Sequence, residues 1–158
     1  MSLSIRRVVT GHDEQGRAVV KIDETAQNVI SNRPGASFWV VWSTDAWPVS
    51  NDGDDDPSGR PIGTTIPDGT VFRVVRYEPG VAPRRHRTDS IDYGVVLSGE
   101  IDMELDDEVV TLRAGDLLVQ RGTIHNWVNR GTVDCVIAFV LVSAKPVEIN
   151  GAPLSAHG

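Results

Sequence analysis

The sequence has few of the features that mark secreted or membrane-bound proteins. Its 158 residues include a single cysteine, Cys135, so no disulfide framework within the chain can stabilise it. No apolar run is long enough for a signal peptide near the N-terminus or for a transmembrane span elsewhere. We therefore expect a soluble protein of the cytoplasm that does not interact with membranes.

Positive charge is also scarce. Lysine and arginine together number 15, against 22 aspartates and glutamates, which gives a net charge of −7 and a pI of about 5.0. Such a chain repels the phosphates of nucleic acid, although Arg84, Arg85 and Arg87 form one local basic cluster. No helix-turn-helix or similar DNA-reading segment is recognisable. We expect no nucleic-acid partner.

Helical periodicity is nearly missing as well and appears only weakly around residues 23–30. The chain instead contains short β-prone segments separated by glycine-containing turns, a pattern typical of a β-sandwich or barrel. The expected strands are residues 5–9, 18–22, 37–43, 70–78, 93–97, 101–105, 109–112, 117–120, 127–129 and 134–142. The pattern predicts an all-β protein.

Length and composition predict one domain over residues 1–158, because a chain of this size can bury its own core. We expect an N-terminal strand extension at about 1–50, an acidic loop at about 51–68 and a barrel core at about 69–145. The acidic loop lacks the spacing and closing glutamate of an EF-hand, so we expect it to be mobile and solvated.

Two strands have patterns that predict how their faces are covered. Trp39 and Trp42 are an odd number of residues apart, so a regular strand would place them on opposite faces. Residues 136–142 are apolar at odd and even positions alike, which predicts a strand buried on both faces. Such a strand, together with the extra N-terminal strands, needs covering, and we expect a homodimer to provide it.

The residues that can carry chemistry lie between Gly80 and Asn129. His86, Thr88 and Asp92 share even parity, so a continuous strand would direct all three to one face. His125 lies on another strand, and closure of a barrel would bring it opposite His86. Two imidazoles and one carboxylate suit a divalent metal ion such as Fe, Zn, Ni, Mn or Cu.

The spacing of these residues resembles that of the cupin superfamily. The first cupin motif, G-x5-H-x-H-x3,4-E-x6-G, is followed in register by Gly80, His86, Thr88, Asp92 and Gly99. The second motif, G-x5-P-x-G-x2-H-x3-N, is matched in a form one residue shorter. Its matching positions are Gly115, Gly122, His125 and Asn129, with Gln120 in place of the proline. The resemblance covers about half of the chain. It implies a double-stranded β-helix, or jelly-roll barrel, here with additional N-terminal strands. It also implies a metal ion in the mouth of the barrel and commonly a dimer.

The chain departs from the first motif at two metal-binding positions. Thr88 replaces the second histidine, and a hydroxyl is a poorer ligand than imidazole, so we expect Thr88 to face water or substrate. Asp92 replaces the glutamate and has one methylene less. We expect one divalent metal ion (Fe, Zn, Mn or Ni) held by His86, Asp92 and His125. The alternative is a metal-free cupin in which these three residues are hydrogen-bonded in the pocket.

The surrounding residues predict contacts with a small-molecule substrate. We expect Thr88, Trp127, Asn129 and Arg73 to bind it, with core packing as the alternative for Trp127. No residue is assigned as catalytic acid, base or nucleophile. The resemblance implies an enzyme acting on a small oxygen-rich metabolite, either a carboxylate or an aromatic or polyketide-like compound. The expected reaction is a decarboxylase, dehydratase or isomerase-type lyase reaction. The alternatives are a non-heme iron dioxygenase and a non-catalytic module that binds a small ligand.

Overall fold

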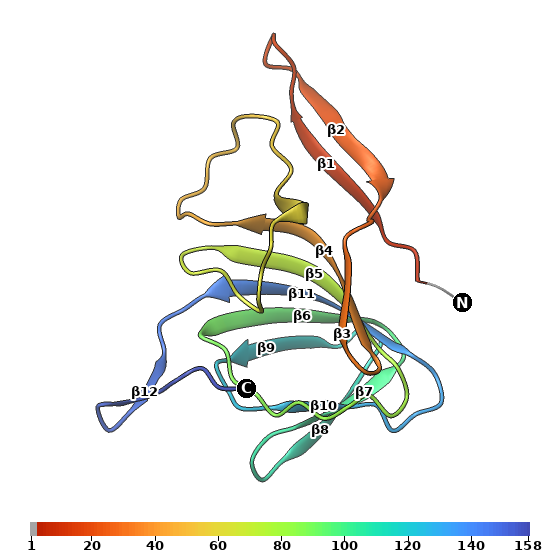
Figure 1. Ribbon diagram of the computed structural model, residues 1–158, viewed down its shortest axis with the longest axis vertical. Coiled ribbons are helices and arrows are strands. Elements are labelled where there is room, and N and C mark those ends of the chain that lie inside the picture. The colour runs from red at the N-terminus through yellow and green to blue at the C-terminus, as the bar shows by residue number, and fades with distance from the viewer. Residues whose placement is uncertain (1–2) are drawn as a thin grey trace.

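The computed structural model describes residues 3–158 and confirms an all-β protein (Figure 1). Within these residues the only helical element is the short 3₁₀ turn η1, Pro57–Gly59. The strands are β1 Arg6–His12, β2 Ala18–Thr25, β3 Val29–Arg33, β4 Ala36–Thr44, β5 Thr70–Tyr77, β6 Ser90–Ser98, β7 Glu100–Glu104, β8 Val109–Arg113, β9 Leu117–Arg121, β10 Asn126–Val128, β11 Cys135–Ser143, β12 Val147–Ile149 and β13 Ala152–Leu154. No helix in the described part of the chain is long and apolar enough to cross a membrane.

Two sheets form the barrel. The larger has six strands in the order β3-β4-β5-β11-β6-β9, and the smaller has three in the order β10-β7-β8. In Figure 1 the smaller sheet lies below the larger one, and the hairpin of β1 and β2 projects away from both. This is the two-sheet jelly-roll arrangement that the sequence predicts.

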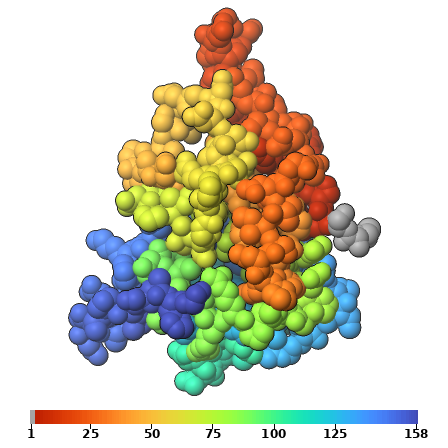
Figure 2. Space-filling view, in the orientation of Figure 1, coloured from red at the N-terminus to blue at the C-terminus, as the bar shows by residue number. Residues whose placement is uncertain are grey.

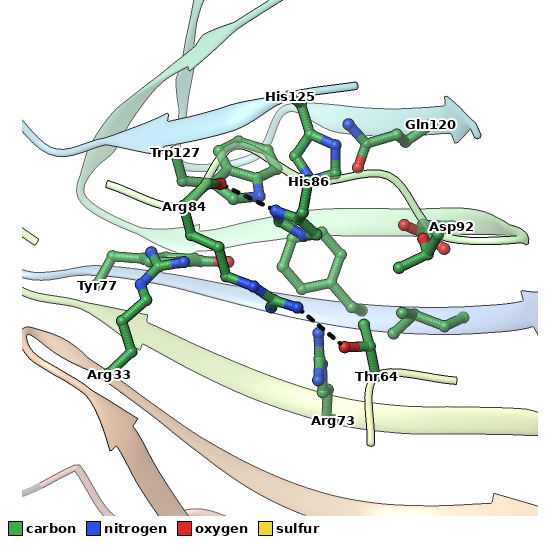
Figure 3. A pocket seen from close by; sticks show the side chains of 13 residues that line it. Arg33, Thr64, Arg73, Tyr77, Arg84, His86, Asp92, Gln120, His125 and Trp127 are labelled. Carbon is green, nitrogen blue, oxygen red and sulfur yellow. Dashed lines mark hydrogen bonds between the residues drawn. The ribbon is translucent and has the colours of Figure 1, made fainter. Parts of the chain in front are cut away.

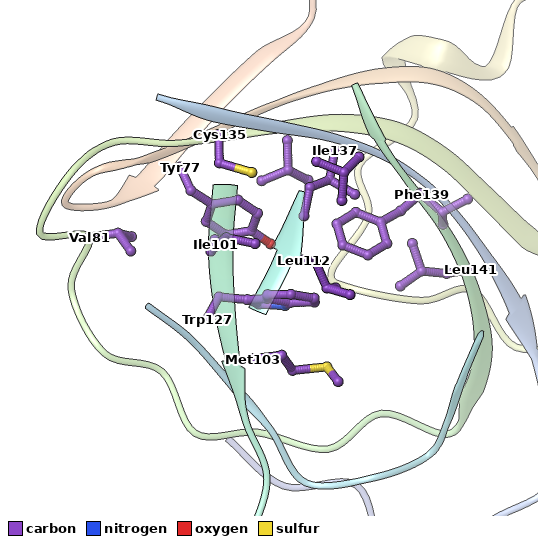
Figure 4. Packing of buried hydrophobic residues seen from close by; sticks show 13 residues of the cluster. Tyr77, Val81, Ile101, Met103, Leu112, Trp127, Cys135, Ile137, Phe139 and Leu141 are labelled. Atoms are coloured by element: carbon purple, nitrogen blue, oxygen red, sulfur yellow. The ribbon is translucent and has the colours of Figure 1, made fainter. Parts of the chain in front are cut away.

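The hydrophobic core fills the space between the two sheets (Figure 4). The larger sheet contributes Ile137, Phe139 and Leu141 of β11, at odd positions of one strand, and the smaller sheet contributes Ile101 and Trp127. Side chains alternate across a strand, so the odd residues of β11 point inward together. Val140 and Val142, at even positions, are only half-buried. Val136, also at an even position, is buried, so the prediction that both faces of this strand are buried holds at its start and is wrong at Val140 and Val142.

A β-bulge overturns the prediction for the tryptophans of β4. Trp39 pairs with Val74 of β5, and Trp42 pairs with Phe72, with a register shift between Val40 and Trp42. Val74 and Phe72 are two residues apart and lie on one face of β5, so Trp39 and Trp42 share a face. A bulge inserts one unpaired residue and reverses the parity of everything after it.

Strands of the N-terminal half of the chain take part in the barrel. Strands β3 and β4 belong to the six-stranded sheet itself, and the weak helical pattern at residues 23–30 corresponds to no helix. The acidic loop is exposed over residues 51–56, as expected, but it is held where η1 begins. There the buried Arg7 guanidinium binds the carboxylates of Asp56 and Glu24, and Ser43 Oγ donates to Pro57 O at 3.1 Å.

The segment that follows η1 returns to the barrel mouth instead of remaining a solvated linker. Ile62 and Ile66 pack against the core, and Thr64 lies between them. In Figure 2 this yellow segment lies beside the orange strand β3, which comes from a distant part of the sequence. The two segments together line the outside of the barrel opening.

Candidate metal and substrate pocket

His86 and His125 are placed side by side by the backbone. Their main chains form an isolated antiparallel bridge, in which each N–H donates to the other residue's carbonyl at 3.0 Å. Directly opposed residues of an antiparallel pair direct their side chains to the same face. The two imidazole ring centroids are accordingly 4.2 Å apart, and both residues are buried.

Each imidazole is oriented by a carbonyl two residues before it. His86 Nδ1 lies 2.9 Å from Arg84 O, and His125 Nδ1 lies 2.9 Å from Thr123 O. A carbonyl only accepts, so Nδ1 carries the proton and the neutral ring has its free lone pair on Nε2. Burial, with the neighbouring His125 as the next cause, lowers the pKa of His86 to about 3, and burial lowers the pKa of His125 to about 4. Two neutral imidazoles with anchored Nδ1–H groups are the form in which histidine binds metals.

The carboxylate of Asp92 lies on the wall of the same pocket, on strand β6. Ser90 Oγ donates to Asp92 Oδ1 at 2.6 Å, and Thr88 Oγ1 lies 2.8 Å from Ser90 Oγ. Burial raises the pKa of Asp92, while the Ser90 hydrogen bond and the charge of Arg73 oppose that change. His86, Thr88 and Asp92 all line this pocket, which is the placement that their shared parity predicts.

The structure brings six of the seven predicted site residues to one pocket, shown in Figure 3. They are Arg73, His86, Thr88, Asp92, His125 and Trp127. The seventh, Asn129, is placed elsewhere. It follows the end of β10, so the alternation of side chains between the two faces of a strand no longer sets its direction. Its side chain instead stabilises a turn by hydrogen bonds. Its Nδ2 donates to Tyr77 O and Val133 O at 2.9 Å, and its Oδ1 accepts from the Gly131 N–H at 2.9 Å.

Residues 3–158 contain no group of three or more His, Cys, Asp or Glu side chains spaced to hold a metal ion. The donors that lie together are the two imidazoles, and Asp92 lies on the wall beside Gln120, with which it pairs across β6 and β9 (Figure 3). The donor chemistry of His86 and His125 fits a divalent ion. The ligand roles of His86, Asp92 and His125 remain predictions.

Several pocket residues were not predicted as site residues from the sequence. Arg33 is the last residue of β3, and Thr64 lies in the segment interpreted as a solvated loop. Tyr77 shares the odd parity of Arg73 on β5, which is the one sequence signal that pointed to it. Gln120, at the position of the family's proline, is buried in the wall, and Arg84 is the member of the basic cluster that faces the pocket.

Two connected spaces make up the site. The inner pocket, about 40 Å³, is lined by the histidines and Asp92, and the outer pocket, about 500 Å³, opens toward solvent. Arg33, Thr64, Arg73, Tyr77 and Arg84 line both spaces and so form the passage between them. An outer space of this size is in the range of small-molecule sites, which are roughly 300–1,000 Å³.

Comparisons with known proteins agree with this architecture. A family model described as "Cupin domain" matches residues 73–142, which contain the core strands and both histidines. Of the solved structures, AerE from Microcystis aeruginosa is similar in fold, with a TM-score of 0.52 and 19% identity, over 77% of this chain and 47% of that one.

Two fungal relatives are similar over nearly the whole chain. "Phomopsin biosynthesis cluster protein C'" of Diaporthe leptostromiformis is 40% identical, over 92% of this chain and 82% of the relative. "Cupin-domain-containing oxidoreductase fogC" of Aspergillus ruber is 35% identical, over 96% of this chain and 78% of the relative. With these relatives, the motif spacing and the two-sheet barrel in agreement, the chain belongs to the cupin family.

Proposed function

We propose that this cupin is a metal-dependent enzyme that acts on a small oxygen-rich metabolite, with His86 and His125 as metal ligands. The observation that carries the proposal is the cross-strand histidine pair, buried and 4.2 Å apart between ring centroids, with both Nδ1 atoms held by carbonyls. An arrangement that fixes two neutral imidazoles in this way leaves two Nε2 lone pairs free to bind the same ion.

The chain's own residues supply the remaining polar groups of the inner pocket. Asp92 adds a carboxylate whose direction is set by Ser90, and we propose it as the third ligand or as a group held next to the ion. Gln120 adds a buried amide to the same wall. When bound, a divalent ion would supply Lewis-acid chemistry toward a carbonyl or carboxylate oxygen of the substrate.

Two reaction classes are compatible with this site. Oxidation, as in a non-heme iron dioxygenase, is supported by the name of the Aspergillus ruber relative, which is called an oxidoreductase. A decarboxylase, dehydratase or isomerase-type lyase reaction is the second candidate, and the three guanidinium groups that line the pocket favour the carboxylate substrate that decarboxylation needs. Oxygen uptake with candidate catechols or diketones separates the two classes, because a lyase reaction consumes no oxygen.

Metal retention tests the proposed ligands. We expect His86→Ala and His125→Ala each to lower the bound divalent metal, measured by mass spectrometry of the purified protein, by about tenfold or more, because each removes one of only two adjacent imidazoles. His12→Ala is the matched control, since His12 lies exposed at the end of β1. Full retention of metal in both site variants would rule out the proposed site, as would equal loss in the control.

We also propose a homodimer formed through the outer face of β6 and β9. These strands expose five large apolar side chains, each 40–75% accessible: Tyr93, Val95, Leu97, Leu117 and Val119. They lie side by side at an edge of the six-stranded sheet. Soluble monomers rarely expose contiguous apolar surface of this kind, and a second copy would bury it.

Substitution on this face tests the dimer. We expect Leu117→Glu to convert a dimer into a monomer, measured by light scattering during size-exclusion chromatography, because the glutamate would be desolvated in the interface. Val109→Glu is the control, since Val109 is 60% exposed on the smaller sheet, away from the proposed interface. A wild-type protein that is monomeric at all concentrations contradicts the proposal.

A further inference from the structure

Three guanidinium groups meet at the passage between the inner and outer pockets. Arg33 comes from the end of β3, Arg73 from the middle of β5 and Arg84 from the segment before His86. Figure 3 shows the three side chains on the same side of the histidine pair, with Arg73 and Arg84 directed toward each other. We call these three residues the arginine cluster.

Within residues 3–158, no side-chain carboxylate lies within salt-bridge distance of the arginine cluster, and Asp92, whose pKa burial raises and the charge of Arg73 partly lowers, is the acidic residue that shares the inner pocket with it. None of the salt bridges within residues 3–158 includes Arg33, Arg73 or Arg84, although other arginines of the protein are paired. Over the same residues, Arg73 Nε and Arg33 Nε and Nη2 are buried without any hydrogen-bond partner. The Arg84 guanidinium is the member of the cluster that already has partners, since it donates to Thr64 Oγ1 at 3.3 Å and to Gly158 O at 2.9 Å.

Unpaired charges in this position are costly. Burying an ion without a partner costs several kcal/mol, and three like charges around one opening repel each other. Stacking offsets a part of this, since the Arg73 guanidinium lies 4.8 Å from the Phe38 ring centroid and that of Arg33 lies 5.8 Å from the Tyr77 centroid. Stacking uses the faces of the guanidinium planes, however, and leaves the in-plane N–H donors free for an anion.

The outer pocket differs in character from the passage. Its wall includes Ile30, Phe38, Ile62, Val75 and Pro83, all apolar, and its volume of about 500 Å³ is many times that of the inner pocket. The inner pocket, at about 40 Å³, has room only for a few water-sized groups beside the histidines. A ligand that fills both spaces is therefore apolar on the outside, anionic in the middle and small at its inner end.

We propose that the substrate is a carboxylate with a ring-sized apolar body. Its carboxylate binds the arginine cluster, its apolar body lies in the outer pocket, and only a small group next to the carboxylate reaches the histidine pair. Arginine is the residue best suited to this task, because its planar donors bind a carboxylate in pairs. This inference rests on one part of the proposed function, namely that this pocket is the substrate site.

Calorimetric binding of two isosteric probes, 2-naphthoate and neutral 2-naphthamide, tests the inference on the full chain. We expect naphthoate to bind about tenfold or more tightly than naphthamide, because only the carboxylate satisfies the cluster. Arg73→Met and Arg33→Met should each weaken the binding of naphthoate by about tenfold or more and leave the binding of naphthamide unchanged. Arg113→Met, at an exposed arginine paired with Glu100, is the control and should bind both probes as the wild type does.

The outcomes separate this inference from the metal proposal. Arg33 is half-buried and lies at the end of β3, near the edge of the larger sheet, so Arg33→Met remains informative even if Arg73→Met fails to fold. Loss of naphthoate binding in His86→Ala but not in Arg33→Met would assign the carboxylate to the metal and overturn the inference. Equal binding of the two probes, or no binding of naphthoate to the wild type, also overturns it. Dependence on the arginines in a protein that retains no metal supports the inference and contradicts the metal proposal.

Discussion

Replacing Trp127 with alanine should destabilise the protein by about 3–5 kcal/mol, the usual cost of removing a fully buried aromatic side chain. Trp127 is 2% exposed, and its ring centroid lies 5.9 Å from those of Tyr77 and Phe139 and 5.8 Å from that of His125. The variant would therefore leave a cavity between the two sheets. It would also remove the ring edge that packs beside His125.

Urea denaturation at one fixed protein concentration measures this effect. We expect the midpoint of Trp127→Ala to fall without a change in slope, and a melting temperature lower by roughly 10 °C for a domain of this size. Trp127→Phe is the control, because it keeps an aromatic ring in the same space. Its free energy of unfolding should fall by less than half as much as that of Trp127→Ala. A loss below about 1 kcal/mol in Trp127→Ala would show that Trp127 is not part of a close-packed core.

Replacing Gly99 with alanine should have an effect of similar size through the backbone. Gly99 joins β6 to β7 with a φ of +76°, which costs an alanine about 1–2 kcal/mol. An added Cβ would also lie 2.3 Å from Asp134 O and 2.9 Å from Cys135 Cα, both backbone atoms at the start of β11. Since neither can move without shifting the central strand of the larger sheet, we expect a total loss of about 3 kcal/mol or more.

Gly80→Ala separates the two causes. Gly80 has nearly the same backbone conformation, with a φ of +72°, but an added Cβ there would meet nothing within 4 Å. It should therefore cost only the conformational part, about 1–2 kcal/mol. The difference between the two unfolding free energies measures the steric part at Gly99. Equal losses in the two variants would show that close approach of β11 does not explain the glycine at this position.

Most strands of the fold could be predicted because their pattern is local. Alternation of apolar and polar residues between glycine turns located all the strands of the barrel core, from β5 to β11, within a few residues. Strands β3, β12 and β13 were not predicted, since their pairing with a neighbouring strand is not marked by a clear local alternation. The bulge in β4 could not be predicted either, because the register shift arises from how β4 pairs with β5.

The candidate site divides in the same way. His86, Thr88 and Asp92 could be predicted to share a wall, because they belong to one segment with constant parity. The motif spacing indicated that His125 lies opposite, and the backbone bridge between the histidines confirms this placement. Asn129 matched the family motif equally well, but its amide holds a turn outside the pocket. A motif position specifies a residue type without specifying which group that residue binds.

By itself, the sequence determined the all-β class, the cupin family and the two histidines of the inner pocket, because each depends on local spacing along the chain. Only the tertiary structure showed the arginine cluster, since Arg33, Arg73 and Arg84 come from three separate segments with no common motif. Likewise, only the pairing of β6 with β9 gathered the exposed apolar residues on one face. Both features arise from contacts between segments that are distant in the sequence, and such contacts are decided by how the sheets close around the core.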